Sequence, residues 1–183
     1  MILLVAGLVL WIGAHLFKRV APGPRARLGD PGKGLVALAL VLSVVLMVLG
    51  YRAAPYVDVW YPPLWLKHVN NLLMLAAFAL FGNGAAKGTL SARIRHPQLT
   101  AFKIWAVAHL LVNGDLASIL LFGGLLAWAV AEVIVINRSQ PWDRPTDVSV
   151  KGDLKALAIG LVLYVVAVAI HLWAGVNPFG GGG

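Results

Sequence analysis

Long apolar segments alternate with short polar ones along the whole chain. We mark six apolar segments, at residues 1–17, 35–50, 64–81, 98–112, 116–136 and 154–173. A transmembrane helix needs about 20 mainly apolar residues, and each segment can approach that length by adding residues from its flanks. The fourth is the weakest, because Asn113-Gly114-Asp115 turns or kinks the chain where it ends. The pattern predicts an all-α integral membrane bundle of about six transmembrane helices.

Lysine and arginine residues gather in alternate loops. Only Arg52 and Lys67 lie on one side of the predicted bundle, and Lys103 lies just inside the fourth segment on the other side. Because positive charge marks the cytoplasmic face, we expect a multi-pass protein of the cell inner membrane with both termini outside the cytoplasm. The remaining twelve basic residues follow the first, third or fifth segment: Lys18, Arg19, Arg25, Arg27, Lys33, Lys87, Arg93, Arg95, Arg138, Arg144, Lys151 and Lys155.

The composition supports a membrane protein and excludes several other classes. Hydrophobic residues make up 60% of the 183 residues and charged residues 12%, and a soluble core of this size cannot hide so much apolar surface. The net charge of +8 does not indicate nucleic-acid binding, since the basic residues are spread over short loops. The absence of cysteine excludes disulfides, thiolate ligands and cysteine nucleophiles. We expect one domain over residues 1–179, followed by a glycine tail at 180–183 to which we assign no function.

Four histidines fall within the apolar segments: His15, His68, His109 and His171. An ionisable group at membrane depth is costly and needs a partner or a purpose. Each could bond to a neighbouring helix, but neutral imidazole is also a good ligand for iron, copper and zinc. We therefore expect at least two of them to bind one cofactor. His96 differs, because it lies in Arg95-His96-Pro97 at the start of a helix.

Haem suits these residues better than a bare metal ion. Carboxylates are scarce near the apolar segments, and no two histidines have the spacing of zinc ligands on one helix. Haem needs only one or two axial histidines and flat apolar walls. Trp11 precedes His15 by one helical turn, and Trp105 precedes His109 in the same way. Small residues, which would let a macrocycle approach the backbone, flank both histidines: Gly13, Ala14, Ala106 and Ala108.

These motifs resemble a known family. Its most specific block here begins with Arg95-His96-Pro97-Gln98, continues through residues 104–110 and ends with Asn113-Gly114-Asp115 and Ser118. Weaker matches are Gly13-Ala14-His15, His171 and Gly175-Val176-Asn177-Pro178. The chain closely resembles the NnrU family, which includes bacterial membrane proteins linked to denitrification. The haem-b-containing zeta-carotene isomerases of plants and cyanobacteria look like relatives of that family.

The resemblance implies that His15 and His109 are the two axial iron ligands of a haem b. Trp11 and Trp105 would then stand beside the macrocycle, and its propionates would pair with basic residues on the cytoplasmic side: Arg93, Arg95 or Arg19. The rival ligand pair is His68 with His171, both near the outer face, where only Arg52 and Lys67 are basic.

The function implied is redox or gas-linked haem chemistry in nitrogen-oxide metabolism, or isomerisation of a lipophilic polyene. The isomerases carry a cysteine where this chain has Ala106, so a ligand exchange through a thiolate is not available here. Whether the protein is an enzyme stays open. The expected partners are membrane lipid, haem and a lipophilic small molecule.

Two alternatives stay open. Arg95-His96-Pro97 also resembles the start of the S-adenosylmethionine site in isoprenylcysteine-type membrane methyltransferases. Those enzymes complete the site with an acidic, tyrosine-rich segment, whereas residues 132–151 here offer Glu132 and Arg138 but no tyrosine. The motif is also typical of a simple helix start, with Pro97 as the first helical residue. The other alternative is a non-enzymatic accessory protein for assembling respiratory complexes.

Overall fold

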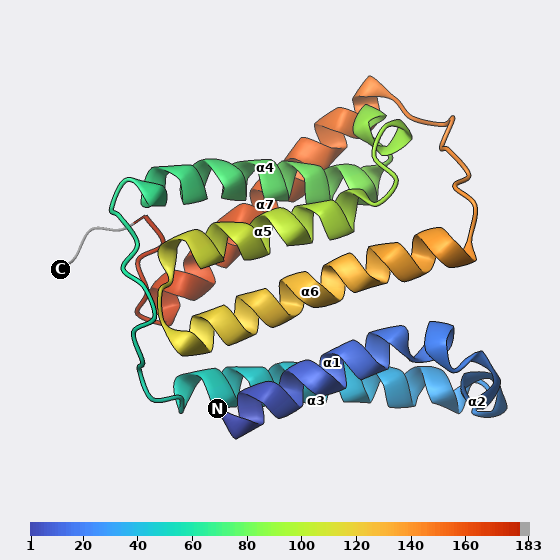
Figure 1. Cartoon of the computed structure of the whole chain (residues 1–183). Helices are drawn as coiled ribbons and strands as arrows, with labels where there is room; N and C mark the ends of the chain where they lie inside the picture. The colour runs from blue at the N-terminus through green and yellow to red at the C-terminus, as the bar shows by residue number, and fades with distance from the viewer. Residues whose placement is uncertain (180–183) are drawn as a thin grey trace. The chain divides into compact units, whose positions relative to one another are not determined.

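The computed structural model describes residues 1–179 and contains α-helices joined by short loops (Figure 1). The predicted glycine tail at 180–183 lies outside the described residues. Within residues 1–179 the extended pairing is limited to an isolated bridge between Asp58 and Asp115, so the all-α prediction is confirmed. The elements are α1 (Ile2–Val20), α2 (Pro22–Arg27), α3 (Pro31–Arg52), α4 (Leu66–Ala86), the 3₁₀ turn η1 (Thr89–Ala92), α5 (Pro97–Val112), α6 (Leu116–Ser139) and α7 (Val150–Trp173).

Within the described part of the chain, five helices are long and apolar enough to cross a membrane: α1, α3, α4, α6 and α7. The sixth predicted span is α5, whose 16 residues give a length of about 24 Å, short of the roughly 30 Å hydrocarbon core of a bilayer. The segment marked as the weakest in the sequence is thus the shortest of the six in the structure. The prediction of about six membrane helices agrees with this architecture.

The helix boundaries follow from local chemistry. α1 continues through Lys18 and Arg19 and stops before Pro22, which then becomes the first residue of α2. At the start of α6, a carboxylate oxygen of Asp115 accepts a hydrogen bond from the backbone N–H of Ser118 at 2.9 Å. This bond caps the N-terminus of α6.

The described chain divides into two compact units, each built from two separate stretches of sequence. Unit 1 comprises Met1–Tyr61 and Asn113–Arg138, and therefore contains α1, α2, α3 and α6. Unit 2 comprises Pro62–Val112 and the chain from Ser139 onwards, and therefore contains α4, α5 and α7.

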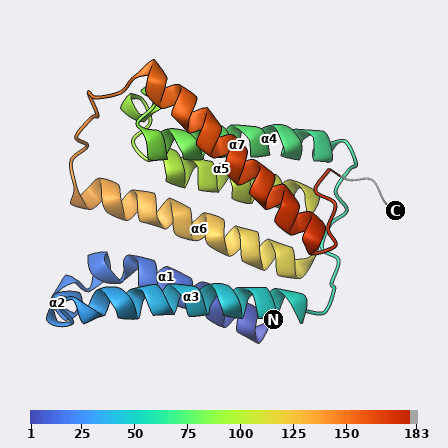
Figure 2. The same cartoon turned by 180° about the vertical axis from the view of Figure 1, so that it is seen from behind.

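Glycine brings α1 and α3 together in unit 1. A Cβ atom added to Gly50 would lie 2.2 Å from the backbone N of Leu4, and one added to Gly7 would lie 2.7 Å from the side chain of Met47. Small residues at such crossings let helix backbones pack closely where lipid supplies no hydrophobic driving force. α1 crosses α3, and α2 lies at the end where α1 leads into α3 (Figures 1 and 2).

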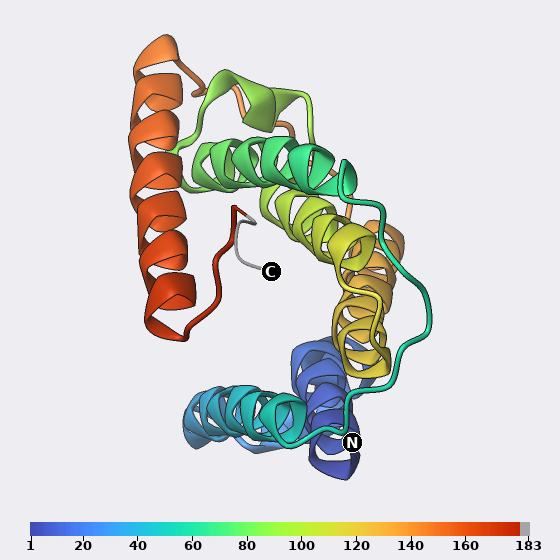
Figure 3. The ribbon, with the colours of Figure 1, turned by 90° about the vertical axis from the view of Figure 1, so that its left-hand side faces the viewer.

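In unit 2, α4 packs against both α5 and α7 (Figure 3). Gly82 of α4 makes the closest approach, because a Cβ atom there would lie 2.1 Å from the carbonyl oxygen of Ala156 on α7. The start of α7 is fixed by Asp153, whose Oδ1 accepts hydrogen bonds from the Asn83 side-chain amide (3.2 Å) and the Thr89 backbone N–H (2.7 Å). Close backbone packing and a side-chain hydrogen bond therefore both connect α4 to α7.

Candidate functional site: three oriented imidazoles

Three of the four predicted membrane histidines have the same local geometry. The Nδ1 atom of each lies within hydrogen-bond distance of the carbonyl oxygen four residues earlier: 3.0 Å for His15, 2.9 Å for His109 and 2.7 Å for His171. A carbonyl oxygen can only accept, so Nδ1 carries the proton and the lone pair is on Nε2. Metal-binding histidines commonly have this arrangement, which fixes both the tautomer and the ring orientation.

In unit 1, His15 lies between two indoles. Its ring centroid is 4.2 Å from that of Trp11, one turn earlier on α1, and 4.5 Å from that of Trp128 on α6. The two indoles meet edge to face, with centroids 5.2 Å apart. Trp11 was predicted to stand beside His15, whereas Trp128 was not predicted and comes to the site from a distant part of the sequence.

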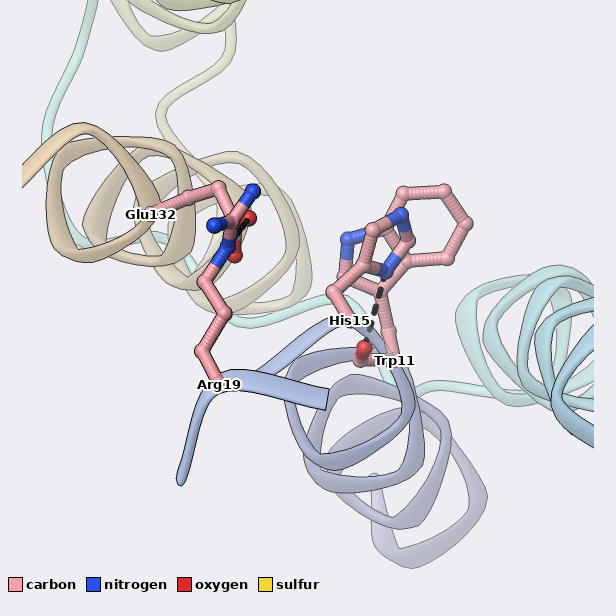
Figure 4. A network of polar contacts seen from close by, with 4 residues as sticks. All are labelled: Trp11, His15, Arg19 and Glu132. Carbon is pink, nitrogen blue, oxygen red and sulfur yellow. Dashed lines mark hydrogen bonds and ion pairs between the residues drawn. The ribbon is translucent and has the colours of Figure 1, made fainter. Parts of the chain in front are cut away.

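One turn beyond His15, Arg19 donates from Nε to Oε1 of Glu132 on α6 at 3.0 Å (Figure 4). The Glu132 side chain is 10% exposed and that of Arg19 25%. Oε2 of Glu132 is buried and has no hydrogen-bond partner, and the same is true of the indole N–H of Trp11. Unit 1 thus places an ion pair and two unsatisfied polar atoms around one imidazole.

The Arg19–Glu132 pair was missed in the sequence, where Glu132 counted only as part of an alternative methyltransferase site. A signal was present: Trp11, His15 and Arg19 recur every four residues on α1, and Trp128 and Glu132 have the same spacing on α6. Two such stripes face each other when their helices pack in parallel. The structure pairs Arg19 with the carboxylate of Glu132. The predicted pairing of Arg19 with a haem propionate stays a prediction.

In unit 2, the structure brings His109 close to His171. Their ring centroids are 6.4 Å apart, and Trp105 lies 5.0 Å from His109 as the sequence predicted. With metal–nitrogen bonds of about 2 Å, two imidazoles that share one metal ion keep their ring centres roughly 6 Å apart. The rival prediction paired His171 with His68 instead, and His68 is exposed near the start of α4.

Among residues 1–179 there is no group of three or more His, Cys, Asp or Glu side chains that could hold a metal ion. A structural or catalytic zinc ion needs at least three such ligands, whereas a haem iron needs one or two. Haem as the group that these imidazoles bind stays a prediction.

The arginines before α5 have structural roles or face outward. Arg95 donates a hydrogen bond to the backbone carbonyl of Gln140, which ties the start of α5 to the segment after α6. Arg93 is exposed. Both precede Pro97, which is the first residue of α5, so they lie at the opposite end of that helix from His109. Their predicted pairing with haem propionates stays a prediction, and the helix-start interpretation of Arg95-His96-Pro97 agrees with the structure.

Together, the apolar helices and the oriented intramembrane imidazoles define a class: an α-helical membrane protein with a set of candidate cofactor ligands. The sequence model described as NnrU protein matches residues 3–178, nearly the whole chain, and the chain belongs to the NnrU family. No curated protein and no solved structure matches it. The resemblance proposed from the sequence is confirmed.

Proposed function

We propose that this NnrU-family protein binds one haem b, with Nε2 of His109 and Nε2 of His15 as the axial ligands. The observation that carries the proposal is the shared Nδ1 bond, which places the proton on Nδ1 and the lone pair on Nε2 of each ring, the tautomer that a metal-binding histidine uses. The indoles one turn before each histidine, Trp11 and Trp105, would supply flat apolar surface for the macrocycle. The sequence resemblance supports the same two residues.

A haem held by these two imidazoles would supply one-electron or gas-binding chemistry. The part of this chain is to hold and orient the two rings and to exclude water. We propose that this chemistry serves nitrogen-oxide metabolism, with isomerisation of a lipophilic polyene as the other haem-dependent reaction. The inner membrane and the outward termini are part of this proposal, and the distribution of the basic loops supports them.

A visible spectrum of the purified protein tests the proposal directly. We expect a Soret band and one haem b per chain when haem is extracted and quantified against protein. A folded protein that shows no Soret band and binds S-adenosylmethionine would overturn the proposal in favour of a methyltransferase. A folded protein that binds neither would leave an accessory role in assembly.

A second pair of ligands, His109 with His171, is favoured by the 6.4 Å between their rings. Single alanine variants separate the pairs. If His15 and His109 are the ligands, His15→Ala and His109→Ala lose six-coordinate haem and His171→Ala keeps it. Loss in His109→Ala and His171→Ala, with haem retained in His15→Ala, would establish the pair within unit 2. Loss confined to His68→Ala and His171→Ala would establish the rival pair predicted from depth.

His96→Ala is the matched control for these variants, because His96 lies at the start of α5 rather than within a predicted span. We expect it to retain the haem spectrum. Helical content and monodisperse elution must match the wild type in every variant, so that loss of haem is not confused with loss of the fold.

A further inference from the structure

An apolar groove of about 390 Å³ runs between α1 and α3 in unit 1. It lies on a different stripe of α1 from Trp11, His15 and Arg19, so it is separate from the imidazole site. Its size falls within the range of small-molecule sites, which is roughly 300–1,000 Å³. The residues that shape it are Leu10, Gly13, Phe17, Leu28, Leu35 and Ala39.

The groove follows from the way the two helices cross. Gly50 and Gly7 hold α1 and α3 in backbone contact toward the end where α1 begins and α3 finishes. Toward α2 the helices separate, and a Cβ atom added to Gly13 would meet nothing within 4 Å. Glycine and alanine at Gly13 and Ala39 leave the space open instead of filling it with side chains.

Basic residues gather along the chain at the end of unit 1 where α2 joins α1 to α3. Lys18 follows the lining residue Phe17, and Arg27 precedes the lining residue Leu28. Both side chains belong to exposed residues, and neither has an ion-pair partner in the described part of the chain. Nearby Lys33 is different, because it pairs with Asp30 at 2.8 Å.

We propose that this groove binds one acyl chain of an anionic glycerophospholipid whose phosphate is held by Lys18 and Arg27. The acyl chain is selected by packing, since lipid tails are as apolar as the groove and gain only van der Waals contact there. The headgroup is selected by charge, because each Lys or Arg near the membrane surface attracts anionic lipid. A neutral lipid fits the same groove but gains nothing from the two cations.

Native mass spectrometry of the full chain in detergent tests the site, with phosphatidylglycerol and phosphatidylcholine of identical acyl chains as probes. We expect the wild type to prefer phosphatidylglycerol at least tenfold. Removing both charges in Lys18→Gln/Arg27→Gln should weaken phosphatidylglycerol binding by about 30-fold and leave phosphatidylcholine unchanged. Removing two basic charges elsewhere, in Arg52→Gln/Lys67→Gln, is the matched control and should have little effect.

The groove itself is tested by filling it. Gly13→Leu should displace both lipids, whereas Gly34→Leu, at an exposed α3 position where a Cβ atom also meets nothing, should not. If Gly13→Leu fails to fold, Ala39→Leu fills the groove from α3. Equal binding of the two lipids by the wild type would overturn the proposal. So would unchanged binding in both filled variants.

A second copy of the chain is the competing occupant. The chain has no cysteine, so Gly13→Cys introduces a unique thiol in the groove. We expect it to remain monomeric under oxidising conditions in lipid. Efficient disulfide dimers that no longer bind phosphatidylglycerol would assign the groove to a helix of another copy instead.

Discussion

His15 and His109 follow a tryptophan by one turn on helices of different units, yet their tertiary neighbours differ. His15 is enclosed by two indoles and stands next to the Arg19–Glu132 pair. His109 has a second imidazole, His171, at 6.4 Å. The same local motif can therefore be built into a polar network or into a pair of potential ligands. The difference lies in what the second helix contributes.

Glycine has two different roles in the two units. In both, glycines allow backbone contact between helices, as Gly50 does in unit 1 and Gly82 in unit 2. Gly13 and Gly123 in unit 1 instead have open space where a side chain would be. Close contact is thus concentrated at particular positions, and this makes the comparison testable by adding a single methyl group.

The largest expected effect comes from Gly50→Ala and Gly82→Ala. Each added Cβ atom would overlap the backbone of the neighbouring helix, which cannot move away as a side chain can, so we expect a loss of about 3 kcal/mol or more of stability. Thermal unfolding in detergent measures it. Gly13→Ala and Gly123→Ala are the controls and should change stability by less than about 1 kcal/mol. Equal tolerance of all four substitutions would show that the crossings are not fixed by these contacts.

The next largest effect distinguishes the polar networks of the two units. Arg19→Gln leaves the buried Glu132 carboxylate without its cation and should cost about 3 kcal/mol. Glu132→Gln leaves Arg19, which is a quarter exposed and can reach water, so the cost should be smaller, at about 2 kcal/mol. In unit 2, Asp153→Asn keeps an oxygen acceptor for Asn83 and Thr89 and should cost about 1 kcal/mol.

A double-mutant cycle provides the control. The double variant Arg19→Gln/Glu132→Gln removes both charges, so it should recover part of the stability lost by Arg19→Gln. Additive losses, with no recovery, would show that the two side chains act independently. Urea or thermal unfolding of the three variants against the wild type gives the coupling.

Much of the fold could be predicted because it depends on local chemistry. Apolar length marks the helices, Pro22 and Pro97 mark helix boundaries, and Asn113-Gly114-Asp115 marks the break between α5 and α6. The indole positions one turn before His15 and His109 were also predictable, because residues four apart share a helix face.

The tertiary partners could not be predicted in the same way. Trp128 and Glu132 lie more than 100 residues from His15 and Arg19, and periodicity along one helix does not say which other helix will face it. The proximity of His171 to His109 was missed for a related reason. His68 was predicted as the partner of His171 because both lie at a similar depth in the membrane. Depth does not determine which helices are neighbours, and the structure brings His171 close to His109.

The smallest expected effect concerns an exposed contact in unit 2. Lys87, the residue that ends α4 in a left-handed conformation, pairs with Asp147 in the segment before α7. The hydrogen bond and the positive charge of Lys87 lower the pKa of Asp147 below its ordinary value of 3.8. The pair therefore stabilises the contact fully above that value, and the contribution is lost as the pH falls through the lowered pKa. Both side chains are well exposed, at 67% and 62%, so we expect only about a twofold change in local protection against hydrogen exchange.

Hydrogen exchange of residues 140–149, corrected for the intrinsic effect of pH, measures this change. The comparison is with Lys87→Gln, in which the segment should show the lower protection already at neutral pH. A wild type and a variant with the same protection at pH 7 would show that the pair does not hold this segment, and would leave Asp153 as the contact that fixes the start of α7.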